Sequence, residues 1–213
     1  MAASRPARRA ALAGIALALL PVLTACGSGG SDNGLAGVQT VDNGGWNGAY
    51  LDTPYVVPDV ALKDTSGAPF TLATSTAPLK IVFFGYSRCP DICQIMMSTI
   101  AQSLAHLSTA DRARVQVVFV TTDPARDTGP VLRSYLDRFA NGFVGLTGTL
   151  PTIEKLATPL KVFIAKGRKL PSGGYEVDHS TYVFGVTGHD AKVIWTQGTS
   201  PSQMAADITK LLT

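Results

Sequence analysis

The sequence LKIVFFGYSRCPDIC, residues 79–93, joins a continuous apolar run to two cysteines four positions apart. The run from Leu79 to Phe84 has the length and composition of a buried strand, and the residues after it have a helical pattern. Cys89 and Cys93 are therefore expected at a strand-to-helix turn. Backbone N–H groups at a helix N-terminus favour negative charge, so a thiolate forms more readily there.

The spacing of the two cysteines favours metal binding. Pro90, between them, suits the first helical position. On a helix, positions i and i+4 share a face with Cβ atoms about 5–6 Å apart, whereas a disulfide requires about 3.5–4.5 Å. Two thiolates that bind the same metal ion, each at about 2.3 Å, tolerate the wider separation of the Cβ atoms. The usual redox spacing, Cys-x-x-Cys, is one residue shorter, and a structural disulfide stays open as an alternative.

The rest of the chain predicts strands that alternate with helices. A turn at residues 64–67 indicates a short N-terminal hairpin, and a helix of residues 202–212 is expected to close the domain. This order predicts an α/β fold, a central mixed but mainly parallel sheet flanked by helices, on the plan of a thioredoxin-like domain. The expected hairpin spans residues 61–72; the other strands are 79–85, 115–120, 143–146, 161–165, 173–186 and 191–196, and the other helices are 92–107, 131–139 and 153–157.

His179 completes the candidate site. It lies in the segment of residues 177–181, which directly precedes the apolar run of residues 182–184. In a thioredoxin-like domain the loop before this strand faces the dithiol and usually holds a cis-proline, but here a histidine stands in that place. Two thiolates and one imidazole make a soft three-ligand site suited to Cu(I), whereas structural zinc requires a fourth ligand.

Three motifs in this order resemble the Sco/SenC family, the copper chaperones of cytochrome c oxidase assembly. They are GYSRCPDIC at residues 85–93, TDPARDT at 122–128 and VDHS at 177–180, and the resemblance covers about residues 58–212. One small departure is Gln94, where a proline often follows the second cysteine.

The resemblance implies that Cys89, Cys93 and His179 bind copper, as Cu(I) or Cu(II). It also implies that the two cysteines are a redox-active pair that cycles between dithiol and disulfide. Copper would be delivered to the dinuclear copper site of a cytochrome c oxidase subunit, or that site would be reduced. The partners implied are that subunit and an upstream copper donor or thiol reductant. A metallochaperone is expected rather than an enzyme, and a monomer.

Two carboxylates are expected around the metal ligands. Asp123 follows a predicted strand and precedes a proline, so it either forms a turn or orients His179 or the dithiol loop. Asp91 lies between the cysteines, where it either interacts with the helix dipole or also tunes the acidity of the thiols.

The N-terminus predicts export and lipidation. Basic residues precede an apolar run at residues 10–20, and Leu-Thr-Ala-Cys at 23–26 resembles a bacterial lipobox. Residues 1–25 are expected to be a lipoprotein signal peptide, by a Sec or a twin-arginine route, and Cys26 the lipidated residue. Residues 26–52, rich in Gly and Ser, are expected to be a flexible tether, and residues 53–213 the folded domain. The protein is thus expected on the extracytoplasmic face of the bacterial cell membrane, anchored by lipid.

The charge balance gives no support to nucleic-acid binding. The chain has 18 Lys and Arg and 15 Asp and Glu, and the expected signal peptide removes three arginines and no acidic residue, which leaves the mature chain near neutral. Three other functions stay open: a thiol–disulfide oxidoreductase that reduces the client's copper-site cysteines, a peroxidase relative of the same fold, and a binding lipoprotein with a structural disulfide. His179 discriminates between them, because disulfide exchange does not need it.

Overall fold

The computed structural model of the chain describes residues 43–73, 75–171 and 174–213. The expected signal peptide, Cys26 and the tether as far as residue 42 lie outside the described residues. None of the described helices is long and apolar enough to cross a bilayer.

One large sheet forms the centre of the described domain, in the strand order β1-β10-β9-β4-β5-β6-β2-β3. Its middle strand, β4, comes from the apolar run and is buried along its whole length, because helices cover both faces of the sheet. The strands are β1 Ala49–Val56, β2 Ala61–Asp64, β3 Pro69–Thr71, β4 Leu79–Gly85, β5 Val115–Thr121, β6 Val144–Thr147, β9 Val183–Thr187 and β10 Asp190–Trp195.

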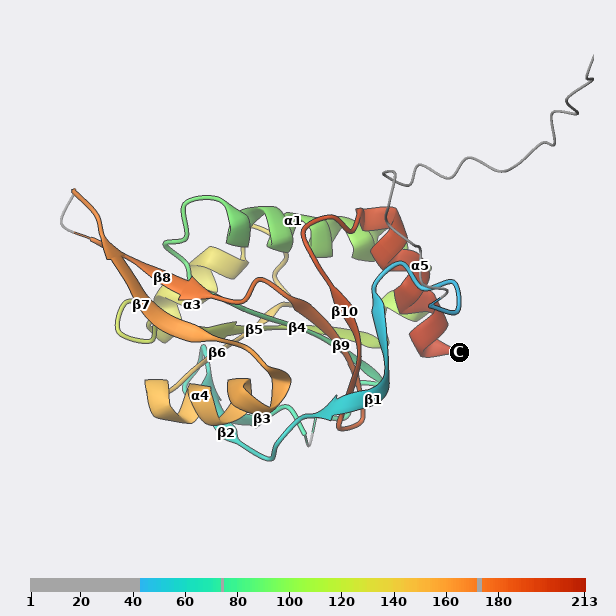
Figure 1. Cartoon of the computed structure of the whole chain (residues 1–213), viewed down its shortest axis with the longest axis horizontal. Coiled ribbons are helices and arrows are strands. Elements are labelled where there is room, and N and C mark those ends of the chain that lie inside the picture. The colour runs from blue at the N-terminus through green and yellow to red at the C-terminus, as the bar shows by residue number, and fades with distance from the viewer. Residues whose placement is uncertain (1–42, 74, 172–173) are drawn as a thin grey trace, which may run out of the picture. The chain divides into compact units, whose positions relative to one another are not determined.

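Side chains of β4 alternate between two apolar layers, as the period of a strand requires. Ile81 and Phe83 pack with the helices α1, α3 and α5, whereas Val82 and Phe84 pack with α4 and the short 3₁₀ helix that follows it. In Figure 1, α1 and α5 lie on one side of the sheet and α4 on the other. The helices are α1 Ile92–Ala105, α2 Thr109–Arg112, α3 Gly129–Leu136, α4 Leu150–Ala157, the 3₁₀ helix Thr158–Leu160 and α5 Pro201–Leu212.

The thioredoxin-like α/β fold is confirmed, but the expectation of a mainly parallel sheet is wrong. The pairs β4–β5 and β5–β6 are parallel. The pairs β1–β10, β10–β9, β9–β4, β2–β3 and β2–β6 are antiparallel. The sheet is mixed because the expected N-terminal hairpin, β2–β3, joins one side of the parallel core and the C-terminal strands join the other.

A separate two-stranded sheet consists of β7 Ile164–Lys169 and β8 Tyr175–His179. One strand was expected over residues 173–186, but the described part of this range holds β8 and most of β9, with a break between them. At the break, the Ser180 N–H donates to the Phe163 carbonyl and the Phe163 N–H donates to Ser180 Oγ. Strand β7 begins three residues later than expected, because Lys161 adopts a left-handed backbone with φ of 57° after the 3₁₀ helix.

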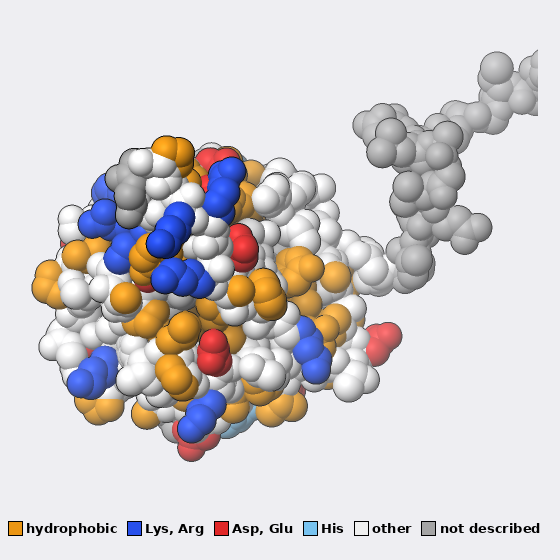
Figure 2. Space-filling model, turned by 60° about the vertical axis from the view of Figure 1, so that its left-hand side comes forward, with side chains coloured by type: hydrophobic (Ala, Val, Ile, Leu, Met, Phe, Trp, Pro, Cys, Tyr) orange, Lys and Arg blue, Asp and Glu red, His pale blue; other side chains and the backbone are white. Residues whose placement is uncertain are grey.

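The β7–β8 hairpin projects from the sheet at the left of Figure 1. Lys166, Arg168 and Lys169 of β7 are exposed. Figure 2 shows basic side chains gathered on the side that carries this hairpin, whereas the rest of the visible face is mixed.

The folded domain begins earlier than residue 53. Residues 43–52, expected in the tether, include the start of β1, which pairs with β10. Asn47 and Gly48 also donate backbone N–H groups to the buried Asp207 carboxylate of α5. The sequence gives little sign of this segment, because β1 is an edge strand whose side chains are mostly exposed or half-buried.

Candidate metal centre

The dithiol lies where β4 gives way to α1. The chain leaves β4 at Gly85, turns through residues 86–91 and enters α1 at Ile92. Cys93 is in the first helical turn, while Cys89 is in the preceding loop, so Pro90 is not at the first helical position. The spacing argument assumed that the two cysteines share one face of a helix. They do not, because only Cys93 is helical. The loop brings the Cys89 sulfur to the helix N-terminus, where the Cys93 N–H donates to it at 3.4 Å.

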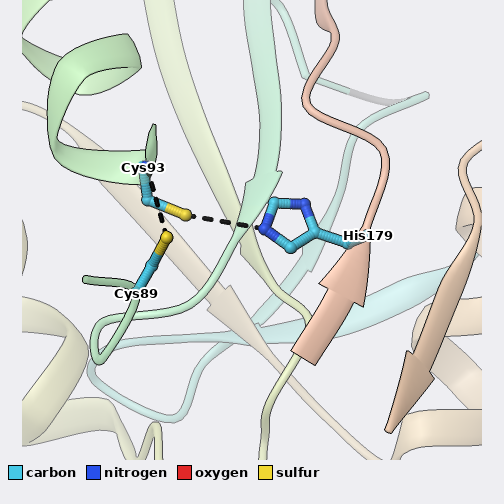
Figure 3. A group of neighbouring side chains, drawn as sticks. All are labelled: Cys89, Cys93 and His179. Atoms are coloured by element: carbon cyan, nitrogen blue, oxygen red, sulfur yellow. Dashed lines mark hydrogen bonds between the residues drawn. The ribbon is translucent and has the colours of Figure 1, made fainter. Parts of the chain in front are cut away.

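Cys89, Cys93 and His179 form one compact cluster (Figure 3). His179 Nε2 lies 3.6 Å from Cys93 Sγ, and the three candidate ligand atoms all lie within 4.8 Å of one another. Metal–sulfur bonds of about 2.3 Å and metal–nitrogen bonds of about 2.0–2.1 Å place ligand atoms about 3.5–4 Å apart around one ion. The cluster is therefore close to the geometry that a single metal ion needs. Both cysteines are buried, and no disulfide joins them.

The imidazole of His179 is oriented for metal binding. Its Nδ1 lies 2.9 Å from the Ser180 carbonyl oxygen, which can only accept a hydrogen bond. Nδ1 therefore carries the proton of this hydrogen bond, and Nε2 is the ring nitrogen that faces the cysteines. The rings of Phe83 and Tyr86 contact the imidazole edge-to-face, with centroids 6.3 and 5.8 Å away. Burial raises the pKa of Tyr86 to about 12, so its hydroxyl stays protonated.

The environment shifts the pKa values of the two cysteines in opposite directions. A hydrogen bond with the Cys93 side chain, aided by His179 and by the backbone N–H groups of Cys93 and Asp91, lowers the pKa of Cys89 to about 4, although burial opposes the shift. The same hydrogen bond with Cys89, together with burial, raises the pKa of Cys93. At neutral pH the pair therefore holds one thiolate, on Cys89, and one thiol, on Cys93.

We expect the reduced, metal-free domain to keep one thiolate down to about pH 4, which ultraviolet thiolate absorption measures. An unfolded cysteine has a pKa of about 8.5, so ionisation of Cys89 stabilises the folded state fully only above that value. This contribution is lost progressively as the pH falls from about 8.5 through about 4. Cys89→Ser is the control, because it removes both the absorption and this part of the pH dependence. Absence of the thiolate at about pH 6 would contradict the assignment.

Asp91 contributes to the site through its backbone. Its side chain is exposed and makes no capping hydrogen bond, although Asp91 is the N-cap of α1. Its backbone N–H forms a hydrogen bond that lowers the pKa of Cys89. Its carbonyl oxygen accepts hydrogen bonds from the backbone N–H groups of Gln94 and Ile95. Tuning of the thiols by the Asp91 carboxylate stays a prediction.

Asp123 lies next to the site, against other partners than those expected. The carboxylate is buried, accepts a hydrogen bond from Tyr175 Oη at 2.8 Å and forms an ion pair with Arg126. These contacts connect the β5–α3 loop to β8. The carboxylate therefore acts on β8, which carries His179 at its end, rather than on the imidazole itself.

Asp127 is a buried carboxylate that sequence reasoning missed. It accepts hydrogen bonds from the Ser87 N–H at 3.0 Å, from the Ser87 hydroxyl and from the Thr121 hydroxyl at 2.7 Å. It thereby fastens the dithiol loop to the end of β5. The available signal was its place in the motif of residues 122–128.

Other residues with sulfur or imidazole side chains lie outside the cluster. Met96 and Met97 are fully buried in the core of α1. His106 and His189 are exposed at the end of α1 and in the turn before β10.

Fold and site together define a thioredoxin-like domain in which two sulfurs and one imidazole form a candidate site for a single metal ion. A family model described as SCO1/SenC matches residues 49–213. The chain therefore belongs to the SCO1/SenC family.

Individual relatives agree with this assignment. The chain is 36% identical over 124 residues to the mitochondrial protein SCO2 of Saccharomyces cerevisiae, a match that covers 58% of this chain and 41% of SCO2. Apo Sco1 from Thermus thermophilus is 30% identical with a TM-score of 0.71, covering 78% of this chain and 97% of that one. ScoI of Bradyrhizobium japonicum, solved with copper bound, is 27% identical with a TM-score of 0.66, covering 74% and 99% of the two chains.

Proposed function

We propose that this protein is a membrane-tethered, extracytoplasmic copper-binding protein that delivers copper to, or matures, the dinuclear copper site of cytochrome c oxidase. The observation that carries the proposal is the cluster of Cys89, Cys93 and His179, with three soft ligand atoms within 4.8 Å. Sulfur and imidazole nitrogen suit Cu(I). The bound copper in the Bradyrhizobium japonicum relative supports the choice of metal.

Binding draws on a different property of each ligand. Cys89 is already a thiolate, His179 offers Nε2 as the imidazole ligand atom, and Cys93 must lose its proton to become a ligand. Copper binding therefore releases one proton. Oxidation of the pair removes two electrons and the same proton and joins the sulfurs in a disulfide, which excludes copper.

The site is accessible from one side. A cleft of about 360 Å³ opens beside Cys89 and His179, and Phe163 in its lining has 61% of its surface exposed. Such an opening suits transfer, because a client's ligands can approach copper from the cleft that Cys89 and His179 line, while Cys93 lies on the buried side.

Anaerobic titration of the reduced domain, from about residue 43 onward, tests the proposal. We expect one Cu(I) per chain, and X-ray absorption spectroscopy should show sulfur and nitrogen neighbours. A stoichiometry below one half, or a spectrum without sulfur, would contradict a copper site at the cluster.

The lowered pKa of Cys89 favours a second candidate, a thiol–disulfide oxidoreductase that reduces the client's copper-site cysteines. A thiolate at neutral pH is the attacking species in disulfide exchange. In that case copper binding would be secondary, and the client would receive electrons rather than metal.

Membrane anchoring is tested through Cys26, the residue at the lipobox. We expect the wild-type protein in the membrane fraction of cells and Cys26→Ser in the soluble fraction, because thioether-linked lipid needs the cysteine sulfur. Mass spectrometry of the purified wild-type N-terminus should find the lipid. A Cys26→Ser protein that is processed and fractionates like wild type would refute the anchor.

A further inference from the structure

The three candidate ligands come from two separate sheets. Cys89 and Cys93 follow β4 of the large sheet, whereas His179 ends β8, which pairs with β7 in the two-stranded sheet. No ladder of backbone hydrogen bonds joins β8 to the large sheet in the described part of the chain. The distance from His179 to the cysteines therefore depends on how side chains hold β8 in place.

Alternate residues of β8 provide that hold. Tyr175, Val177 and His179 share one face of the strand, since successive side chains point to opposite sides. Tyr175 Oη donates to the Asp123 carboxylate at 2.8 Å, Val177 is buried in the core, and His179 reaches Cys93. The same face thus carries a polar anchor at one end and the ligand at the other.

Arg126 lies between this anchor and the dithiol loop. Its guanidinium carbon is 3.7 Å from the centroid of the Tyr175 ring and 5.7 Å from that of Tyr86, and its Nε forms the ion pair with Asp123. Cations stack favourably on aromatic faces, and arginine does so with its planar group. The Tyr86 ring in turn contacts the edge of His179, with the centroids 5.8 Å apart.

The guanidinium is held by its ion pair with Asp123 and by these rings, and its remaining hydrogen-bonding capacity is not all used. Its side chain is only 18% exposed, yet Nη2 is buried and has no hydrogen-bond partner among the described residues. An unpaired buried donor costs free energy. The unpaired Nη2 group is nevertheless present. This fits a role in which Arg126 stacks between two aromatic rings without a complete set of hydrogen bonds.

We propose that Arg126 is a positioning residue of the metal centre: stacked against Tyr175 and Tyr86, it fixes β8 relative to the dithiol loop and so sets the distance from His179 Nε2 to Cys93 Sγ. The consequence for copper rests on the proposed function. The consequence for the imidazole does not, because the contacts exist in the metal-free protein.

Arg126→Gln, which removes the charge and the planar stack, tests the proposal. We expect the Cu(I) affinity, measured by competition with a chelator, to fall by about 10–100-fold, the range typical of groups that orient metal ligands. The Cu(II) electron paramagnetic resonance spectrum should lose or change its nitrogen coupling. Arg126→Lys keeps the charge without the planar group, so it should recover only part of the affinity.

Arg138→Gln is the matched control. The Arg138 guanidinium stacks on the Tyr135 ring with its carbon 4.6 Å from the centroid, and its Nε donates to the Tyr135 carbonyl. Arg138 thus resembles Arg126 in its stacking but does not contact β8. Its replacement should leave copper affinity and the nitrogen coupling unchanged.

Nuclear magnetic resonance of the metal-free protein separates this inference from the proposed function. The His179 ring signals report on the nearby Tyr86 and Phe83 rings, so they should shift in Arg126→Gln and stay in place in Arg138→Gln. Unchanged His179 signals in Arg126→Gln, or equal shifts in both variants, would overturn the positioning role even if copper binds. If Arg126→Gln does not fold, Arg126→Lys gives the same readout, and wild-type signals and affinity in that variant would overturn it equally.

Discussion

Cys93→Ala is expected to abolish tight copper binding. The Cys93 sulfur is one of the three candidate ligand atoms, and it lies 3.6 Å from His179 Nε2. Loss of a group that merely orients a ligand typically costs 10–100-fold in metal affinity, and loss of a ligand should cost more. We therefore expect a decrease of more than about 100-fold in Cu(I) affinity, measured by chelator competition.

Met97→Leu controls for loss of a buried sulfur from the same helix. Met97 is fully buried in α1, and leucine conserves its volume closely enough to keep the core packed. Copper affinity should be that of wild type. Full affinity in Cys93→Ala, or an equal loss in both variants, would refute the metal centre.

His179→Ala is expected to separate copper delivery from thiol chemistry. It removes Nε2 while the dithiol stays, so copper affinity should fall by at least about 10–100-fold. The Cys89–Cys93 disulfide should still form and be reduced, because thiolate attack does not require the imidazole as a ligand. Chelator competition and thiol titration measure the two properties on one sample.

Cytochrome c oxidase activity in cells then decides between the two candidate functions. If copper delivery is the task, cells with His179→Ala should lose oxidase activity and regain part of it when copper is added. Normal oxidase activity in that variant, together with inactivity of Cys89→Ser, would favour the thiol reductase.

The sequence was most informative where burial on both faces left no ambiguity. Continuous apolar runs in β4 and β5 identified the parallel core, and the turn at residues 64–67 identified the β2–β3 hairpin. Strand β1 has no such pattern, because an edge strand with exposed side chains resembles a linker. The boundary between β8 and β9 was missed for a different reason: only residues 180–182 separate the two strands, and the break depends on contacts of Ser180 with Phe163, an earlier part of the chain.

The ligand residues were predictable because sulfur and imidazole carry the chemistry themselves. The supporting residues were not, because their roles depend on partners in other elements. Asp123 was expected at the metal ligands, but it pairs with Tyr175, on a sheet whose existence the sequence did not reveal. Asp127 and Arg126 look like ordinary loop charges until the fold places Ser87 beside one and two tyrosine rings around the other.

Because side chains alternate between the two faces of β8, the metal centre depends on whether the spacing of Tyr175 and His179 is even or odd. One residue inserted between Tyr175 and His179 would keep every ligand and every supporting group in the sequence. With Tyr175 still anchored at Asp123, however, the imidazole would point to the side where Asp178 now lies. Two inserted residues would restore the side but carry the histidine about 6–7 Å further along the strand. The number of residues from the anchor, Tyr175, to the ligand, His179, must therefore be even and must also be the number observed.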